Sequence, residues 1–354
     1  MVPLVDLTRR HSGYAGEFLS AVERVLGSGT VLMGPELDAC EHELALLLGH
    51  RHTVCVSSGA SALQLALRAV GVSAGDEVIV PAFTAVPTAA AVCALGAIPV
   101  LVDVDASTAA IDPAHAAEAI TRRTRAIVPV HLYGRPVDVA PLAAFGVPVI
   151  EDAAQAHGAL RAITGAAAVY SFYPTKNLGG IGDGGAVATD DEGLAATVRR
   201  LRVHGMTEQY VHVDISQNFR MSEIEAAFIR LQLARLDVDN SRRRAIARRY
   251  RQAAPNLRWH DDHPDHVFHL CVARLTARDR VQADLHTAGI HTAVHYPLAI
   301  TQQPAYRSLA TRPCPDAEAW AAETLSVPCS PELTDDEVET VAYALARVPN
   351  DRPE

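Results

Sequence analysis

Short apolar runs alternate with helical patterns through the first two thirds of the chain. Small or polar residues bound each run, which is typical of buried strands; the runs cover residues 52–58, 76–82, 98–104, 126–134, 147–152, 167–173 and 184–190. Segments with apolar residues at helical spacing, such as residues 36–48, lie before and between them. Strands that alternate with helices predict an α/β fold with a mostly parallel central sheet and right-handed crossovers.

The pattern changes after about residue 222. A long helical pattern continues to about residue 251, and the remainder mixes strand and helix patterns up to a capped helix that begins at Thr334. The chain has 354 residues, of which 49% are hydrophobic, so it can bury two cores. We therefore expect a large domain over residues 1–240, which includes the N-terminal segment, and a smaller C-terminal α+β domain over residues 241–354.

Charge and composition exclude several classes of protein. The formal net charge is −10, which disfavours a nucleic acid partner. The 16 histidines are scattered and the six cysteines form no Cys-x-x-Cys pair, so we expect no metal site. The first residues lack the pattern of a signal peptide, and no apolar stretch is long enough to span a membrane. We expect a cytoplasmic protein with no membrane partner.

Lys176 is the only lysine of the chain, and arginine supplies every other basic residue of the 31. Arginine-rich codon usage explains this bias, because arginine replaces lysine on a solvated surface at little cost. Arginine does not replace lysine where a free amine must attack a carbonyl, since the guanidinium stays protonated. Lys176 is therefore a candidate for amine chemistry. The alternative is that this lysine escaped replacement by arginine through chance.

Three features near Lys176 fit a phosphorylated ring cofactor. Asp152 ends an apolar strand, where α/β sheets place ligand-binding groups, and a carboxylate can pair there with a protonated pyridine nitrogen. Ser171 and a glycine-rich segment flank Lys176 and can bind phosphate oxygens. Gly59 and Ala60 open a helix directly after a strand, and a helix N-terminus attracts phosphate. Each feature alone has an ordinary alternative: a helix cap, a turn between strands, or a capped helix.

The chain resembles the DegT/DnrJ/StrS family of sugar aminotransferases, which have the fold type I architecture of pyridoxal-phosphate enzymes. The resemblance covers nearly the whole chain, and EDAAQAHGA followed by SFYPTKNLG is its specific part. The matching motifs are VLMGPEL (31–37), SSGASALQLAL (57–67), GDEVIVPAFT (75–84), RAIVPVHLYG (125–134), EDAAQAHGA (151–159), YSFYPTKNLGGIGDGGAV (170–187), QNFRMSEIEAA (217–227) and HYPLAITQQPAY (295–306). The resemblance implies pyridoxal 5'-phosphate as the cofactor, bound by the large domain.

The resemblance also implies roles for single residues. Lys176 carries the cofactor as a Schiff base and then moves a proton between cofactor and substrate. Asp152 pairs with the pyridine nitrogen, and Gln155 hydrogen-bonds the phenolic oxygen of the cofactor. The cofactor phosphate is held by the Ser171 hydroxyl and by the backbone amides of Gly59 and Ala60.

Three further residues complete the site that the resemblance implies. Asn218 reaches the phosphate of the cofactor in the partner subunit, which implies a homodimer with shared active sites. His295 and Tyr296 lie in a loop that lines the substrate pocket, with ordinary loop packing as the alternative. Ala85 departs from the family pattern, because relatives usually carry an aromatic residue there that stacks on the cofactor ring. Phe83 is an alternative source of such a ring.

The implied reaction is an amino transfer in two halves. An amino acid, which we expect to be glutamate, donates the nitrogen, and a keto sugar linked to a nucleotide accepts it at C3 or C4. The composition, rich in arginine and alanine, fits the biosynthesis of antibiotic deoxysugars. The alternatives are a keto-cyclitol acceptor, a regulatory protein that binds the cofactor without turnover, and a cysteine desulfurase, for which Cys314 is a poor nucleophile.

Overall fold

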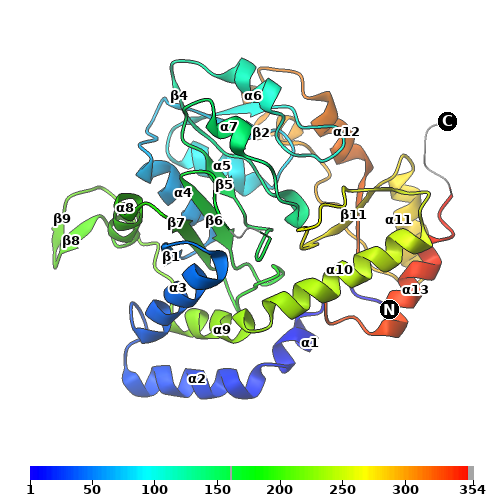
Figure 1. Cartoon of the computed structure of the whole chain (residues 1–354), viewed down its shortest axis with the longest axis horizontal. Coiled ribbons are helices and arrows are strands. Elements are labelled where there is room, and N and C mark those ends of the chain that lie inside the picture. The colour runs from blue at the N-terminus through cyan, green and yellow to red at the C-terminus, as the bar shows by residue number, and fades with distance from the viewer. Residues whose placement is uncertain (160–161, 350–354) are drawn as a thin grey trace.

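The central sheet contains the strands that the apolar runs predict (Figure 1). The computed structural model describes residues 1–159 and 162–349. Within this part of the chain the strand order is β3-β2-β4-β5-β6-β7-β1, with parallel bridges joining the ends of β4 and β5. In the described sheet only β7 runs antiparallel to its neighbours, so the prediction of a mostly parallel sheet is confirmed. The strands are β1 (His52–Val56), β2 (Glu77–Pro81), β3 (Ile98–Val102), β4 (Thr124–Ile127), β5 (Ile150–Asp152), β6 (Ala167–Ser171) and β7 (Gly185–Thr189).

Helices cover both faces of this sheet. Successive residues of a strand point to opposite faces, so each strand contributes side chains to the cores on both sides. Val80 and Val169 pack into the core of one face. Their neighbours Ile79 and Ala168 pack into cores on the other face. The first face is covered by α4 (Gly59–Ala69), α5 (Val86–Ala94) and α8 (Glu192–Arg202), and the second by α3 (Pro35–Leu48), α6 (Pro113–Ala119), α7 (Ala140–Ala143) and α9 (Glu223–Leu233). Both faces being buried explains the continuous apolar runs in the sequence.

Two predicted elements differ from the structure. The strand expected over residues 126–134 ends at Ile127, and Pro129 follows, which has no backbone N–H to give to a ladder. The chain then forms the 3-10 turn η1 (Leu132–Gly134), in which Tyr133 has a left-handed φ of 59°. The long helix expected from residue 222 to 251 is divided between α9 and α10 (Leu236–Ala253), because Arg235 bonds to the carbonyl of Gln232 in a tighter turn.

A second core lies in the C-terminal part of the chain. The antiparallel sheet β10-β11-β12 packs against α10, α11 (Arg278–Thr287) and α13 (Asp335–Leu345). Its strands are β10 (Arg258–Trp259), β11 (Cys271–Arg274) and β12 (Thr324–Val327), and α12 (Pro315–Glu323) precedes β12. Thr334 caps α13 together with Glu337, as the sequence predicts. The domain boundary at residue 240 remains a prediction and would fall inside α10; residues 350–354 lie outside the described part.

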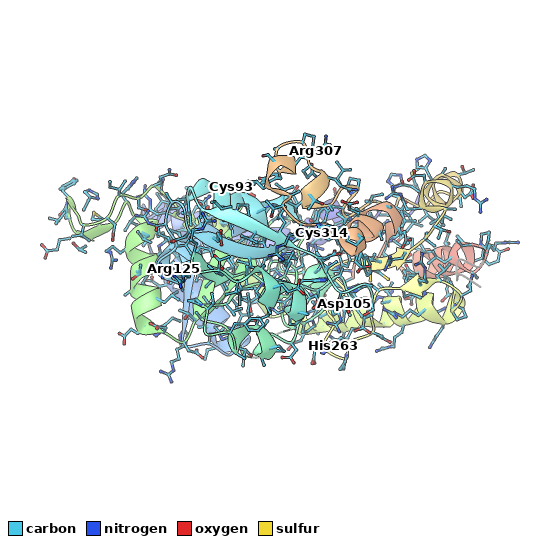
Figure 2. The ribbon with its side chains drawn as sticks, turned by 90° about the horizontal axis from the view of Figure 1, so that it is seen from above. Cys93, Asp105, Arg125, His263, Arg307 and Cys314 are labelled. Carbon is cyan, nitrogen blue, oxygen red and sulfur yellow. The ribbon has the colours of Figure 1, made fainter. Side chains whose placement is uncertain are left out.

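Several elements are not among those predicted from the sequence. They are α1 (Leu7–Ser12), α2 (Ala15–Ser28), the hairpin β8 (Met206–Glu208) and β9 (Val211–His212), and the 3-10 turns η2 (Ile300–Gln302) and η3 (Arg307–Leu309). The hairpin projects from one end of the molecule, away from the sheet (Figures 1 and 2). Helix α2 lies beside α9 on the outside of the fold (Figure 1). Among the described helices, none combines the length and the apolar character needed to cross a membrane.

Candidate active site

A cavity of about 260 Å³ opens at the carboxyl edge of the central sheet. The ends of β5 and β6 and the N-termini of α4 and α5 form its walls, so residues from distant parts of the sequence meet there. Six residues predicted from the sequence line this cavity: Gly59, Ala60, Asp152, Gln155, Ser171 and Lys176. Ligands of α/β sheets bind at this edge, so we take the cavity as the candidate site.

Lys176 lies in a tight turn after β6. Its backbone N–H donates to the carbonyl of Tyr173 at 2.8 Å, which closes the turn. The side chain is half-buried because it lines the open cavity. Burial of the amine lowers the pKa of Lys176 to about 8, while the nearby Asp152 carboxylate acts in the opposite direction. A larger fraction of Lys176 is therefore neutral near pH 7 than the ordinary lysine pKa of 10.5 would allow, and a nucleophile or a base requires this neutral form.

Asp152 is the buried acidic group of the cavity, only 5% exposed, whereas Asp183 in the cavity wall is exposed. Its Oδ2 accepts a hydrogen bond from the Thr88 hydroxyl at 2.9 Å, and its Oδ1 accepts one from the N–H of Ala154 at 3.1 Å. Burial raises the pKa of Asp152, and these two bonds and Lys176 oppose the rise. A buried carboxylate in this position can bind a cationic ring nitrogen.

The amide of Gln155 has a fixed orientation. Its Oε1 accepts the backbone N–H of Tyr133 at 2.6 Å, and its Nε2 donates to the Tyr296 hydroxyl at 3.0 Å. The Gln155 side chain therefore offers its second N–H, and not its oxygen, to a ligand in the cavity. A phenolic oxygen of a ring cofactor is an acceptor, so this orientation fits the role that the sequence implies for Gln155.

Close packing shapes the end of the cavity where α4 begins. Ser58 caps α4 by accepting the N–H of Ser61 at 3.0 Å. A Cβ on Gly59 would lie 2.6 Å from the Cβ of Ser171, so only glycine lets the helix terminus approach this hydroxyl. Free amides and a hydroxyl at a helix N-terminus fit a phosphate group.

No aromatic side chain takes the place of Ala85. Ala85 lines the cavity. The Phe83 ring is fully buried elsewhere, stacked on Trp320 at 6.1 Å between ring centroids and in edge contact with Tyr296 at 6.4 Å. Phe83 is therefore not among the residues that line the cavity. Tyr173 is the aromatic residue in the cavity wall, and it is 53% exposed.

The other three predicted residues lie outside the cavity wall. Tyr296 reaches the site through its hydrogen bond with Gln155, and burial raises its pKa to about 12. His295 shares a hydrogen bond of 2.9 Å between its Nδ1 and the Ser326 hydroxyl, and burial lowers its pKa to about 4, so its ring is neutral. Asn218 is exposed, and its Oδ1 accepts bonds from Arg220 of the same chain.

No local pattern in the sequence predicts the residues that hold the lysine turn. Arg10, from α1, donates through Nη1 to the carbonyls of Pro174 at 2.9 Å and Lys176 at 3.0 Å. Its Nε donates to Glu332 at 2.8 Å, and both side chains are largely buried. These contacts join segments more than 150 residues apart, so no local pattern reports them.

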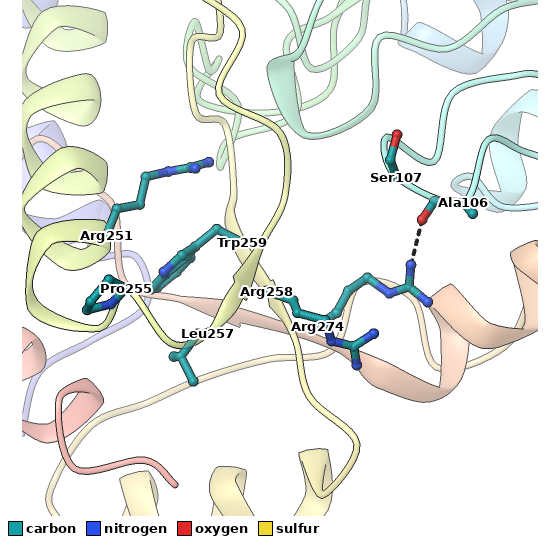
Figure 3. A pocket seen from close by; sticks show the side chains of 8 residues that line it. All are labelled: Ala106, Ser107, Arg251, Pro255, Leu257, Arg258, Trp259 and Arg274. Atoms are coloured by element: carbon teal, nitrogen blue, oxygen red, sulfur yellow. Dashed lines mark hydrogen bonds between the residues drawn. The ribbon is translucent and has the colours of Figure 1, made fainter. Parts of the chain in front are cut away.

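A larger hollow of about 710 Å³ lies elsewhere, beside β10 and β11 (Figure 3). It is lined by Ala106, Ser107, Arg251, Pro255, Leu257, Arg258, Trp259 and Arg274, none of which the sequence predicts as a site residue. The Arg274 guanidinium is already paired with Glu323 at 2.7 Å and donates to the carbonyl of Ala106 at 2.6 Å. Arg251 donates to the carbonyl of His260. These contacts give the arginines a structural role, so this hollow is not the candidate site.

The structure also bears on cysteine and metal chemistry. Cys314 is buried at the start of α12, outside the cavity wall, and burial raises its pKa to about 12 (Figure 2). It therefore lacks the thiolate and the exposure that a desulfurase needs. The described residues contain no group of three or more His, Cys, Asp or Glu side chains that could hold a metal ion.

A lysine and a buried carboxylate line one cavity at the strand ends of the central sheet. This fold and this site define a pyridoxal-phosphate-dependent transferase of fold type I. Residues 14–346 match the DegT/DnrJ/EryC1/StrS aminotransferase family. The chain belongs to this family and is a pyridoxal-phosphate-dependent aminotransferase, which confirms the resemblance seen in the sequence.

Similar proteins agree over almost the full length. The dTDP-3-amino-3,4,6-trideoxy-alpha-D-glucose transaminase of Streptomyces venezuelae is 42% identical over 94% of this chain and 92% of its own. The crystal structure of S. venezuelae DesV in complex with a ketimine intermediate has a TM-score of 0.94 and 41% identity, and the match covers 100% of this chain and 99% of that one. NtdA of Bacillus subtilis, with bound cofactor PMP, has a TM-score of 0.93 and 31% identity over 97% of this chain and 84% of its own.

Proposed function

We propose that this aminotransferase moves an amino group from an amino acid, glutamate being the expected donor, to the keto group of a nucleotide-linked deoxysugar. The observation that carries the proposal is the cavity in which Lys176, Asp152 and Gln155 meet. The match to a transaminase named for a dTDP-linked amino sugar supports the class of acceptor. The position of amination on the sugar is left to the experiment below.

The residues of the cavity fit pyridoxal phosphate group by group. We assign Asp152 to the ring nitrogen, the remaining N–H of Gln155 to the phenolic oxygen, and the phosphate to Ser171 with the amides of Gly59 and Ala60. When bound, the cofactor supplies an electron sink that acidifies the substrate carbon. Lys176 then takes the proton from this carbon in one half of the reaction and returns a proton in the other. Its lowered pKa, about 8, suits both directions near neutral pH.

We further propose a homodimer in which Asn218 reaches the cofactor phosphate of the partner subunit. Exposed apolar side chains support an interface on the hairpin β8–β9 and the residues that follow it: Tyr210 is 84% exposed, Val213 is 60% exposed and Ile215 is 93% exposed. Exposed apolar residues gathered in this way mark contact surfaces. Sedimentation or light scattering should give the mass of two chains, and a monomer at micromolar concentration would contradict the proposal.

A cytoplasmic location is also proposed. All six cysteines lie in the described part of the chain and are free thiols, five of them buried. A chain with free cysteines fits a reducing compartment. Fractionation of the producing cells should recover the protein with soluble cytoplasmic enzymes.

The experiment uses the purified holoenzyme with a panel of amino donors and keto acceptors. Bound pyridoxal phosphate should give a visible absorbance band that glutamate bleaches and a keto sugar nucleotide restores. Lys176→Arg keeps a positive charge but cannot form the covalent link, so it should lose both the band and turnover. Arg125→Lys is the matched control, because it adds an exposed lysine at a loosely paired surface position and should change neither. Turnover by Lys176→Arg, or a band indifferent to every donor, would refute the assignment; preference for a keto-cyclitol would refute the sugar acceptor alone.

A further inference from the structure

Two threonine hydroxyls form a short chain that ends on Asp152. Thr88, in the first turn of α5, donates to Asp152 Oδ2 at 2.9 Å. The hydroxyl oxygens of Thr84 and Thr88 lie 3.2 Å apart. Both threonines are almost fully buried, at 2% and 1% exposure, and both line the cavity. The hydroxyls are thus enclosed by protein at the point where the cavity meets its carboxylate.

The directions of these bonds follow from the number of protons. A carboxylate only accepts, so the single hydroxyl proton of Thr88 points to Asp152. The oxygen of Thr88 then accepts the proton of Thr84. A hydroxyl that is itself an acceptor is polarised and becomes a better donor, and bonds to a charged acceptor are stronger than neutral ones. Thr84 therefore strengthens the bond that Thr88 makes to Asp152.

Asp152 depends on such bonds to keep its charge. Burial raises the pKa of Asp152, and four groups oppose the rise: the N–H of Ala154, the Thr88 hydroxyl, and the charges of Lys176 and His131. A neutral carboxyl group would no longer pair with a protonated ring nitrogen. Of these groups, Thr88 is a neutral side chain that can lose its hydrogen bond with almost no change in shape.

We propose that Thr88 is a positioning residue, whose hydroxyl orients Asp152 and maintains it as the carboxylate that the cofactor ring requires. Thr84 is the outer support of this bond. The inference rests on the proposed role of Asp152 and adds a residue that neither acts on the substrate nor touches the reacting atoms.

The chain offers matched variants for a test. Thr88→Val removes the hydroxyl and keeps the volume, so Oδ2 of Asp152 faces a methyl group in a buried position. Thr88→Ser keeps the hydroxyl on Cβ and removes only the methyl group. Thr53→Val is the control, because Thr53 is 2% exposed and its hydroxyl has no hydrogen-bond partner among the described residues. The three variants separate the loss of a bond from the loss of a buried threonine.

The measurement is the apparent dissociation constant for pyridoxal phosphate, read from the absorbance of the bound cofactor between pH 5 and 9. Thr88→Val should bind about 10-fold more weakly or worse, as expected for a lost bond to a charged group. Its acid limb should move to higher pH, because the carboxyl pKa rises when the bond is lost. Thr88→Ser should stay within about 3-fold of the wild type, and Thr53→Val should match the wild type. A Thr88→Val protein with wild-type affinity and pH profile overturns the proposal, and so does a Thr88→Ser protein that loses as much.

Asp152→Asn distinguishes this inference from the assignment on which it rests. If Asp152→Asn retains wild-type affinity and turnover, the role of Asp152 itself is wrong. If Asp152→Asn loses affinity while Thr88→Val does not, the assignment of Asp152 stands and only the role of Thr88 is refuted. Thermal unfolding of each cofactor-free variant shows whether it is folded before binding is measured.

Discussion

In the cofactor-free protein, Lys176 should lose its proton near pH 8. Burial lowers its pKa from the ordinary 10.5 to about 8. The nearby His157 and His295 add no positive charge at neutral pH, because burial lowers the pKa of His157 to about 3 and that of His295 to about 4. Asp152 supplies the opposing negative charge. Without cofactor, the protein therefore has a buried amine that is half charged at a mildly alkaline pH.

This pKa implies a measurable effect on stability. A fall from 10.5 to 8 corresponds to about 3 kcal/mol, at roughly 1.4 kcal/mol for each pH unit. The figure is an upper limit, because the cavity admits water to the half-buried side chain. Since the folded-state pKa lies below the unfolded-state pKa, the penalty is full below pH 8 and disappears as the pH rises to 10.5. Lys176→Met keeps the length of the side chain without the charge, so it should be more stable at pH 7 by up to about 3 kcal/mol.

Two assays test this reasoning. Lysine labelled with ¹³C at Cε gives a single NMR signal, because the chain has one lysine, and its titration midpoint is the pKa. Denaturant unfolding of cofactor-stripped wild type and Lys176→Met gives the stability difference, which should shrink between pH 7 and pH 10. A midpoint near 10.5, or a stability difference that does not change with pH, would refute the argument. Asp152→Asn should lower the midpoint further, since the carboxylate raises it.

Three further substitutions test other contacts. Gly59→Ala places a methyl group 2.6 Å from the Cβ of Ser171, so it should weaken pyridoxal phosphate binding and destabilise the protein by about 1–3 kcal/mol in thermal unfolding; normal binding would show that the phosphate lies elsewhere. Glu223→Ala removes the acceptor of the N–H groups of Gly34, Glu36 and Leu37 at the start of α3, which should cost about 3 kcal/mol in denaturant unfolding; a loss below about 1 kcal/mol would contradict this capping role. Arg10→Met breaks the bonds to Pro174 and Lys176 and leaves Glu332 unpaired, so we expect a loss of about 3 kcal/mol and faster cofactor dissociation; an unchanged dissociation rate would show that the lysine turn holds without Arg10.

The sequence predicts the sheet well because its strands are buried on both faces. Such strands read as continuous apolar runs; six of the seven runs contain a whole strand, and the run over residues 126–134 overlaps only the end of β4, which begins at Thr124. The exception in length is β4, where Pro129 ends the ladder early. The hairpin β8–β9 is mostly exposed and leaves only a weak pattern, whereas α2 is amphipathic and simply is not among the predicted elements.

The candidate site is predictable where its residues follow strand ends or open helices. Asp152, Ser171 and Gly59 are of this kind, and the cavity brings them together with Lys176. The residues that orient them are not predictable in this way. Thr88 and Tyr133 meet their partners only through the fold, and the left-handed backbone of Tyr133 has no sequence signal beyond the glycine after it. Positioning in this site therefore depends on tertiary contacts and not on local patterns.

The solitary, half-buried lysine has a consequence outside catalysis. Acyl transfer to side chains, isopeptide tagging for degradation and amine-directed cross-linking all need an accessible lysine. This chain offers only Lys176, and its cofactor would occupy that amine. Within this sequence, lysine-directed modification therefore has no target other than the cofactor-binding amine. The same property makes it a useful reagent: amine-reactive dyes or resins should attach to the folded holoenzyme through the N-terminal amine alone, which leaves every active site intact.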